Sequence, residues 1–386
     1  MRLNAWVKLR TWSLEHLARP RTLQTFIPQI DGLRFVAIMA VALYHVRGFV
    51  GAKSGEPEVS SAFQNLLEQG YFGVPLFFVL SGFIICRPWL GSSPPRIGRY
   101  FLRRLTRLEP PYIISLLLVA AARVLWQPES EDLYAHFGAS VLYIHNLIYG
   151  AHSTINGVAW SLEVEWQFYV LAPLLMLSLR MMLPNFRAAA LWTLILIGGI
   201  AYAADTRELP RLSLSIIKYV GFFAAGAWVA TLDTDSREGR RPEWGYDVAG
   251  LALIATILCT LMFSPYLQAA LPALTGLMVL SCLRGPLLGR ALGWWPIYCI
   301  GGMCYTIYLY HFFVVSLVGR VLSPWLESGV PADLMLVVFA LIVIPCVVVA
   351  CTLPYLLIER PFMIWRPGTS RDAHVPTSAS NDLPIG

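Results

Sequence analysis

Two side chains capable of chemistry lie inside an otherwise apolar stretch, residues 30–50: Arg34 and His45. In a helix this eleven-residue spacing is three turns plus ~20°, so both point to one face, roughly 16 Å apart along the axis. Such a run is long enough to span a bilayer, where ionisable side chains are costly. Histidine can act as a base near neutral pH. The alternative is an arginine that reaches the membrane interface and a histidine satisfied by a neighbouring helix.

A second group of candidates is the basic sequence Arg103-Arg104-Leu-Thr-Arg107, which precedes an apolar segment. Arginine binds phosphate oxygens through two parallel hydrogen bonds, so Arg104 and Arg107 could form a phosphate site. The same arginines also fit the enrichment of basic residues on the cytoplasmic side of membrane proteins, and this reading explains most of the pattern.

A third group opens a later apolar helix, in the sequence WSLEVEWQFY from Trp160. Ser161 suits a helix N-cap, and Glu163 suits the first helical turn, where the helix dipole favours acids. Glu165 lies deeper, where a carboxylate usually has a partner.

His311 follows a tyrosine-rich sequence, and it could line a site or serve as a structural histidine. An aromatic belt at the membrane interface explains the tyrosines.

The composition indicates the setting for these residues. Of 386 residues, 57% are hydrophobic and only 13% are charged, with a mean hydropathy of +0.60, whereas soluble domains contain about 25% charged residues. This predicts an all-α, polytopic membrane protein. The basic residues occur mainly in short loops, so the net charge of +6 does not indicate nucleic-acid binding. The seven cysteines show no metal-ligand spacing, so we expect neither disulfides nor a bound metal.

The apolar segments and basic loops predict ten spanning helices with both termini in the cytoplasm. The short segment 137–149 is expected to be re-entrant or interfacial, because a further crossing there would carry Arg180 and Arg187 to the wrong side. We divide the chain into a basic cytoplasmic tail (1–29), a transmembrane domain (30–358) and a largely disordered cytoplasmic tail (359–386). The predicted spans are 30–50, 71–85, 111–126, 160–179, 188–204, 212–232, 247–263, 267–283, 294–318 and 334–358.

Taken in order, these motifs resemble those of the membrane acyltransferase-3 family over nearly the whole chain. The Arg34–His45 pair, the Arg104–Arg107 pair, and Trp160, Ser161, Leu162 and Glu165 match the family's characteristic positions. The matching stretches read IDGLRFVAIMAVALYHV, GYFGVPLFFVLSGFII, RRLTRLEPPY, AWSLEVEWQFYVLAPLL, YTIYLYHFFVV and IERPF. The resemblance implies transfer of an acyl group, often acetyl, from acyl-CoA to hydroxyls of sugars, lipids or secondary metabolites.

On this resemblance, Arg34, Arg104 and Arg107 are expected to bind the phosphates of acyl-CoA. His45 would deprotonate the acceptor hydroxyl or carry the acyl group itself, and Glu165 would orient the imidazole or share the proton transfer. Ser161, Trp160 and His311 would support the site. The expected partners are acyl-CoA, a hydroxyl-bearing acceptor and the bilayer, in a bacterial inner membrane. A transporter and an acyl-group exporter are the competing classes.

Overall fold

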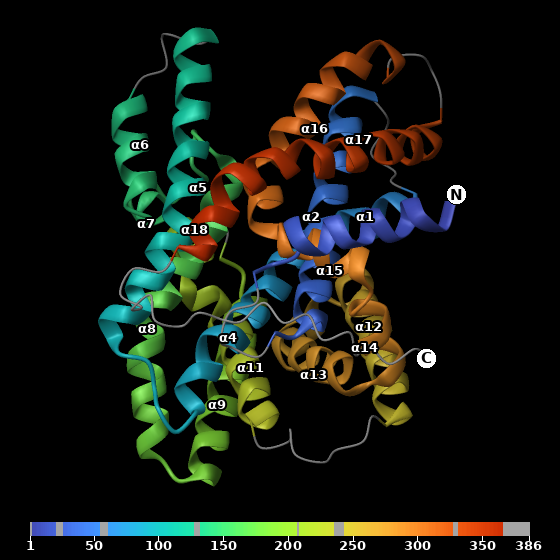
Figure 1. Cartoon of the computed structure of the whole chain (residues 1–386). Coiled ribbons are helices and arrows are strands. Elements are labelled where there is room, and N and C mark those ends of the chain that lie inside the picture. Colours follow the sequence, from blue (N-terminus) through green and yellow to red (C-terminus); the bar gives the residue numbers. More distant parts are fainter. Residues whose placement is uncertain are drawn as a thin grey trace.

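Within the residues that the structure describes, ten helices are long and apolar enough to cross a membrane, as the sequence predicts. The computed structural model describes residues 2–20, 26–54, 61–126, 132–206, 208–234, 243–326 and 331–365, and these ranges contain helices and turns but no strands (Figure 1). The predicted disorder of residues 366–386 lies outside them. The main helices of the spans are α2 (Pro28–Ser54), α4 (Gly73–Leu90), α5 (Ile97–Trp126), α8 (Trp160–Met181), α9 (Pro184–Ala203), α11 (Ile216–Thr234), α12 (Trp244–Phe263), α13 (Leu271–Arg284), α16 (Cys304–Leu326) and α17 (Ala332–Pro354).

Two of the predicted spans differ most from the helices observed. Helix α5 begins at Ile97 and continues through Pro110 and Pro111, whereas the predicted span begins at residue 111. Arginine is a good helix former, so the basic stretch extends the helix instead of preceding it. Arg104 and Arg107 therefore lie roughly 10 and 15 Å along α5. The predicted span 294–318 is divided at Met303 into α15 (Trp295–Gly302) and α16.

Short helices connect the spans. The predicted non-spanning segment consists of α6 (Leu133–Val141) and α7 (His145–Tyr149), separated by Tyr143 with a φ of 57°. Nine and five residues are too few to cross a bilayer. The others are α1 (Arg2–His16), α3 (Ala62–Glu68), η1 (Gln69–Phe72), η2 (Gly157–Ala159), α10 (Pro210–Ser213), η3 (Pro265–Ala270), α14 (Pro286–Leu292), η4 (Tyr355–Glu359) and α18 (Arg360–Ile364).

Basic side chains join helix ends that the charge pattern assigns to one side of the membrane. Arg87 at the end of α4 pairs with Asp233 at the end of α11, at 2.9 Å. Arg180 at the end of α8 donates to the backbone carbonyl of Trp89 at 2.5 Å. Arg284 at the end of α13 donates to the hydroxyl of Tyr246 at the start of α12. These five helix ends therefore lie at one end of the bundle.

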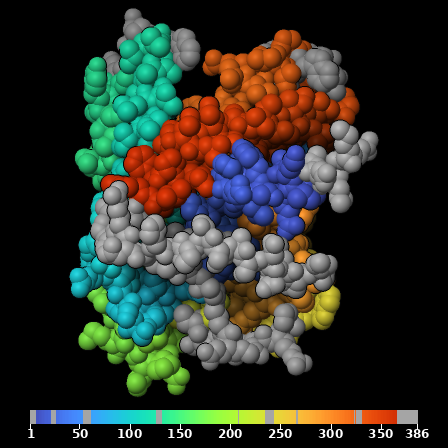
Figure 2. Space-filling model, viewed as in Figure 1, coloured from blue at the N-terminus to red at the C-terminus, as the bar shows by residue number. Residues whose placement is uncertain are grey.

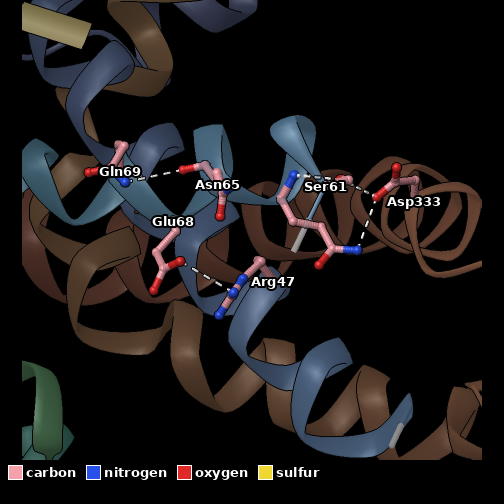
Figure 3. Close-up of polar contacts among 7 residues, drawn as sticks. Arg47, Ser61, Asn65, Glu68, Gln69 and Asp333 are labelled. Atoms are coloured by element: carbon pink, nitrogen blue, oxygen red, sulfur yellow. Dashed lines mark hydrogen bonds and ion pairs between the residues drawn. The ribbon is translucent and has the colours of Figure 1, made fainter. Parts of the chain in front are cut away.

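Polar contacts at the ends of α2 and α17 mark a second set of helix ends (Figure 3). Arg47 pairs with Glu68 at 3.3 Å, and Ser61 donates to Asp333 at 2.7 Å. These residues come from regions predicted to share the outer side. The structure therefore brings together ends that the sequence assigns to the same side.

The first and last described helices also meet. Arg360 of α18 donates a hydrogen bond to the backbone carbonyl of Glu15 in α1, and Figure 2 shows α1 in blue beside the red α17–α18 segment. Helix α1, which the sequence analysis did not predict, packs on α15 through the rings of Trp6 and Trp295, whose centroids are 5.4 Å apart.

Close backbone packing joins α4 to α11. A Cβ at Gly226 would lie 1.9 Å from the carbonyl oxygen of Val79, and a Cβ at Gly82 would lie 2.2 Å from that of Phe223. Small residues permit this close approach between membrane helices. Helix α4 contributes one wall of the candidate site, so this packing helps to position the site.

We expect Gly226→Ala to lower the stability of the protein by about 1–3 kcal/mol, because the added methyl group forces the two backbones apart. The measurement is thermal unfolding in detergent. Gly245→Ala is the matched control, since a Cβ there meets nothing within 4 Å. Equal transition temperatures for the two variants would contradict this account of the packing.

A histidine pair fixes the connection between α6 and α7. The Nδ1 of His145 faces the carbonyl of Ala151 at 3.2 Å, so this nitrogen carries the proton and its Nε2 accepts from His136 Nδ1 at 2.7 Å. Burial and the neighbouring His136 lower the pKa of His145. Protonation of His145 would place an N–H on its Nε2 against the N–H on Nδ1 of His136.

Folding lowers the pKa of His145. Neutral His145 therefore stabilises the folded protein fully at pH values above its unfolded-state pKa of about 6.5, and this stabilisation is lost as the pH falls below that pKa. We expect the unfolding temperature of the wild type to fall between about pH 7.5 and 5.5. His145→Gln should flatten this dependence, whereas His16→Gln should keep it. An unchanged slope in His145→Gln would show that another group is responsible.

Candidate active site

A cavity of about 70 Å³ between five helices brings together five of the predicted site residues. Arg34 comes from α2, Arg104 and Arg107 from α5, and Ser161 and Glu165 from α8. The remaining wall residues come from α4, α5, α8 and α16: Phe77, Phe78, Ser81, Ile84, Ile85, Leu108, Leu162, Tyr169, Cys304, Tyr305 and Tyr308. The cavity therefore combines cationic groups with aromatic and aliphatic surface.

The three lining arginines have different surroundings. Arg34 donates to Asp31 at 2.8 Å, and only 8% of the residue is exposed. The guanidinium of Arg104 lies over the ring of Tyr169, with 5.5 Å between its Cζ and the ring centroid. The buried Nε of Arg107 has no hydrogen-bond partner within the described residues. An anionic ligand would satisfy such a group.

A fourth arginine, Arg19, lies beside this cluster. It approaches Asp31 at 3.6 Å, and its buried Nε and Nη2 make no hydrogen bond with any described residue. Burial, followed by the positive charges of Arg107 and Arg34, lowers the pKa of Arg19 to about 10. Arg19 is not among the predicted site residues, because an arginine in a basic tail carries no sequence signal of burial.

Three carboxylates face these four arginines. Asp31 is shared by Arg34 and Arg19, and Glu165 accepts a hydrogen bond from Ser81. Glu359 is fully buried and accepts from the Thr306 hydroxyl at 2.6 Å. The sequence analysis placed Glu359 at the start of a cytoplasmic tail, although it is the last residue of a π-helical turn at the end of α17. The arginines still outnumber the carboxylates, so the cluster favours an anion.

Ser161 is not the helix N-cap that its position suggested. Helix α8 begins at Trp160 with Ala159 as its cap. The Ser161 hydroxyl lies 2.6 Å from the Tyr308 hydroxyl, which donates to the carbonyl of Val158 at 2.9 Å. Ser161 is therefore the donor to Tyr308. Tyr308 is only 6% exposed, so this tyrosine belongs to the cavity wall and not to an aromatic belt.

Glu163 lies in the first turn of α8, as the sequence predicts. It is fully buried and accepts from the backbone N–H of Asn146 at 2.7 Å. Trp160 packs between His152 and Tyr219, with centroid distances of 5.7 Å to each ring. Both residues thus hold the α6–α7 region against α8 and lie outside the cavity wall.

His45 and His311 form a second constellation outside the cavity wall. His311 Nδ1 faces the carbonyls of Tyr308 and Ile307 at 2.9 and 3.1 Å, so it carries the proton. His311 Nε2 is then an acceptor, and it lies 3.2 Å from His45 Nδ1. His45 Nδ1 also lies 2.9 Å from the carbonyl of Val41. These partners place the proton of His45 on Nδ1 and leave its Nε2 basic.

Tyr308 connects the two constellations. Its ring packs 5.9 Å from the ring of His311, and it lines the arginine cavity. His45 thus lies two ring contacts from the cavity wall. The carboxylate of Glu165 is bonded to Ser81, whereas the imidazole of His45 is held by His311. In this geometry His311, and not Glu165, contacts the imidazole of His45.

Such a fold and interior define an integral membrane protein with an arginine-lined cavity near a pair of histidines. The chain belongs to the acyltransferase-3 family, whose model, described as an acyltransferase domain, matches residues 27–356. This match covers the helices that carry the cavity and both histidines. No solved structure matches the chain.

Several curated relatives carry names that fit this membership. The chain is 26% identical to the peptidoglycan O-acetyltransferase OatA of Listeria monocytogenes over 77% of its own length and 51% of that protein. It is 25% identical to a "putative peptidoglycan O-acetyltransferase", YrhL of Bacillus subtilis, over 87% and 55%. The "putative membrane-bound transacylase BcsY" of Komagataeibacter xylinus is 26% identical over 91% and 85%. The chain spans about half the length of the first two.

Proposed function

We propose that this protein transfers an acyl group, most simply acetyl, from acyl-CoA to a hydroxyl group of a carbohydrate, glycolipid or glycosylated metabolite. The observation that carries the proposal is the arginine cavity separated from the His45 base by the rings of Tyr308 and His311. The names of the relatives OatA and YrhL favour acetyl and a polymeric saccharide.

The arginine cluster suits the phosphates of the donor. Arg104 and Arg107 can bind phosphate oxygens through paired hydrogen bonds, and the unpartnered nitrogens of Arg107 and Arg19 supply further donors. Asp31 already pairs with Arg34. Arg34 therefore contributes mainly by adding positive potential and by holding Asp31 between itself and Arg19.

His45 would act as the base through Nε2. In a direct transfer it removes the proton from the acceptor hydroxyl, and the oxygen attacks the thioester carbonyl. The carbon–sulfur bond then breaks, and the CoA thiolate takes the proton from His45. In the alternative, Nε2 first accepts the acyl group and then passes it to the acceptor. Both routes end with an ester and free CoA.

His311 positions this base. The protonated His45 would carry N–H on both ring nitrogens, and its Nδ1–H would still donate to the unprotonated Nε2 of His311. The two backbone carbonyls hold His311 in that tautomer. A neutral histidine thus takes the place that a carboxylate occupies in a Ser-His-Asp triad.

We place the end of the bundle that carries Arg87, Arg180 and Arg284 in the cytoplasm, in a bacterial inner membrane, because basic residues favour that side. Acyl-CoA would then enter from this end. The contact between α1 and α18 is consistent with both described ends of the chain lying on one side.

Removing charge from the cluster should weaken donor binding. We expect Arg107→Gln, Arg104→Gln and Arg19→Gln each to weaken acetyl-CoA binding about tenfold to a hundredfold, since a hydrogen bond to a charged group contributes about 1.5–3 kcal/mol. Calorimetric titration in nanodiscs at pH 7.5 measures this. Arg123→Gln, on the same helix but outside the cavity wall, is the control. A wild type that binds neither acetyl-CoA nor CoA would reject the donor and leave the transporter reading to be tested.

The histidine pair should affect turnover and not donor affinity. We expect His45→Ala to reduce acetyl-CoA consumption about 10²–10⁴-fold with an unchanged dissociation constant, because it removes the base. His311→Ala should lower kcat and shift its pH profile, and His311→Gln, which can still accept a hydrogen bond, should recover part of kcat. His16→Ala is the control. Full turnover by His45→Ala would contradict the assigned base.

A further inference from the structure

A second, polar cavity lies where α9 ends and α11 begins. Its volume is about 360 Å³, within the range of about 300–1,000 Å³ that small-molecule sites usually occupy. It is open at the surface, and it shares no lining residue with the arginine cavity. The aromatic and polar side chains that line it are Tyr202, Asp205, Thr206, Ser213, Lys218 and Gln268.

This cavity offers neutral and paired polar groups in place of a cationic cluster. Lys218 donates to the carbonyl of Ala204 at 2.7 Å and to the hydroxyl of Thr206 at 3.1 Å, and it interacts electrostatically with Asp205. The amide of Gln268 and the hydroxyl of Ser213 add donors and acceptors. Among the described residues that line the cavity, the single cation lies beside an acid, so this lining is better suited to a neutral ligand rich in hydroxyl groups than to a phosphate.

An aromatic wall gives the cavity a face for the apolar side of such a ligand. Tyr202 is 9% exposed. Lys218 Nζ lies over its ring, 5.8 Å from the ring centroid. A pyranose ring has one face of C–H groups and a rim of hydroxyls, so it can pack on an aromatic ring while its rim binds polar groups. Tyrosine provides both a ring surface and a hydroxyl.

A row of tyrosines connects this cavity to His45. The Tyr202 and Tyr71 side chains are in hydrogen-bonding contact. The rings of Tyr71 and Tyr44 lie 6.3 Å apart, and that of Tyr44 lies 5.1 Å from His45. His45 is therefore linked to the arginine cavity through His311 and Tyr308, and to the polar cavity through Tyr44, Tyr71 and Tyr202.

We propose that the polar cavity is the acceptor subsite and binds a neutral saccharide at the end of the tyrosine row that lies away from His45. This rests on the proposed function for the reaction, but the binding of a saccharide can be measured without it. On the charge pattern, α9 ends and α11 begins on the outer side. The acceptor would then enter from the side opposite to acyl-CoA.

The test uses the full-length protein in nanodiscs, with the N-acetylglucosamine tetramer and cellotetraose as probes. Saccharide binding is followed by saturation-transfer NMR and calorimetry, and acetyl-CoA binding is measured on the same samples. We expect Asp205→Asn and Lys218→Met to weaken saccharide binding at least about tenfold, the loss of roughly one hydrogen bond to a charged group. Acetyl-CoA affinity should not change. Lys8→Met is the control for the lysine.

A second variant covers the case in which Lys218→Met fails to fold. Ser213→Cys, treated with a bulky thiol reagent, should lose saccharide binding, while the untreated variant and the treated wild type should keep it. His45→Ala should bind saccharide normally. The proposal is overturned if the wild type binds neither probe, or if both the substitutions and the thiol block leave binding unchanged. A wild type that binds saccharide but does not bind acetyl-CoA would instead reject the proposed donor.

Discussion

The cost of burying arginine in an apolar bundle is the constraint on which the rest of this structure depends. A guanidinium taken out of water without partners is strongly disfavoured. Here Arg19, Arg34, Arg104 and Arg107 lie close to one another, so mutual repulsion adds to that cost. Asp31, Glu165, Glu359 and the rings of Tyr100 and Tyr169 reduce it. Among the described residues, some guanidinium nitrogens still lack hydrogen-bond partners, and an anionic ligand would supply them.

The helix packing follows from the need to hold this cluster. Helix α2 carries Arg34 and His45 at different depths, and it is packed against α4, α15, α16 and α17. A Cβ at Gly301 of α15 would lie 1.7 Å from the backbone carbonyl of Asp31, so only glycine allows α15 to approach the start of α2. The carboxylate that pairs with both Arg34 and Arg19 is thereby fixed at the edge of the cavity.

The sequence predicted the spans, the non-spanning segment 137–149 and the motifs that supply the cavity, because hydropathy and charge act over short stretches. It did not predict which side chains meet. Ser81 and Tyr308 have ordinary surroundings in sequence, and their partners Glu165 and Ser161 lie 84 and 147 residues away. The His45–His311 contact spans 266 residues. Such pairings depend on tertiary packing, which a local pattern does not contain.

The position of Glu359 has a consequence for how the protein is made. Helices α2 and α5 bring their arginines into the membrane early in synthesis, while Glu359 emerges about 250 residues after Arg107. Until the last span inserts, the arginine face lacks one of its three carboxylates. The cluster is therefore most positive in the incomplete chain, and insertion of the final helix is electrostatically favoured by the helices already assembled. Assembly of the cluster thus ends with the last crossing of the membrane.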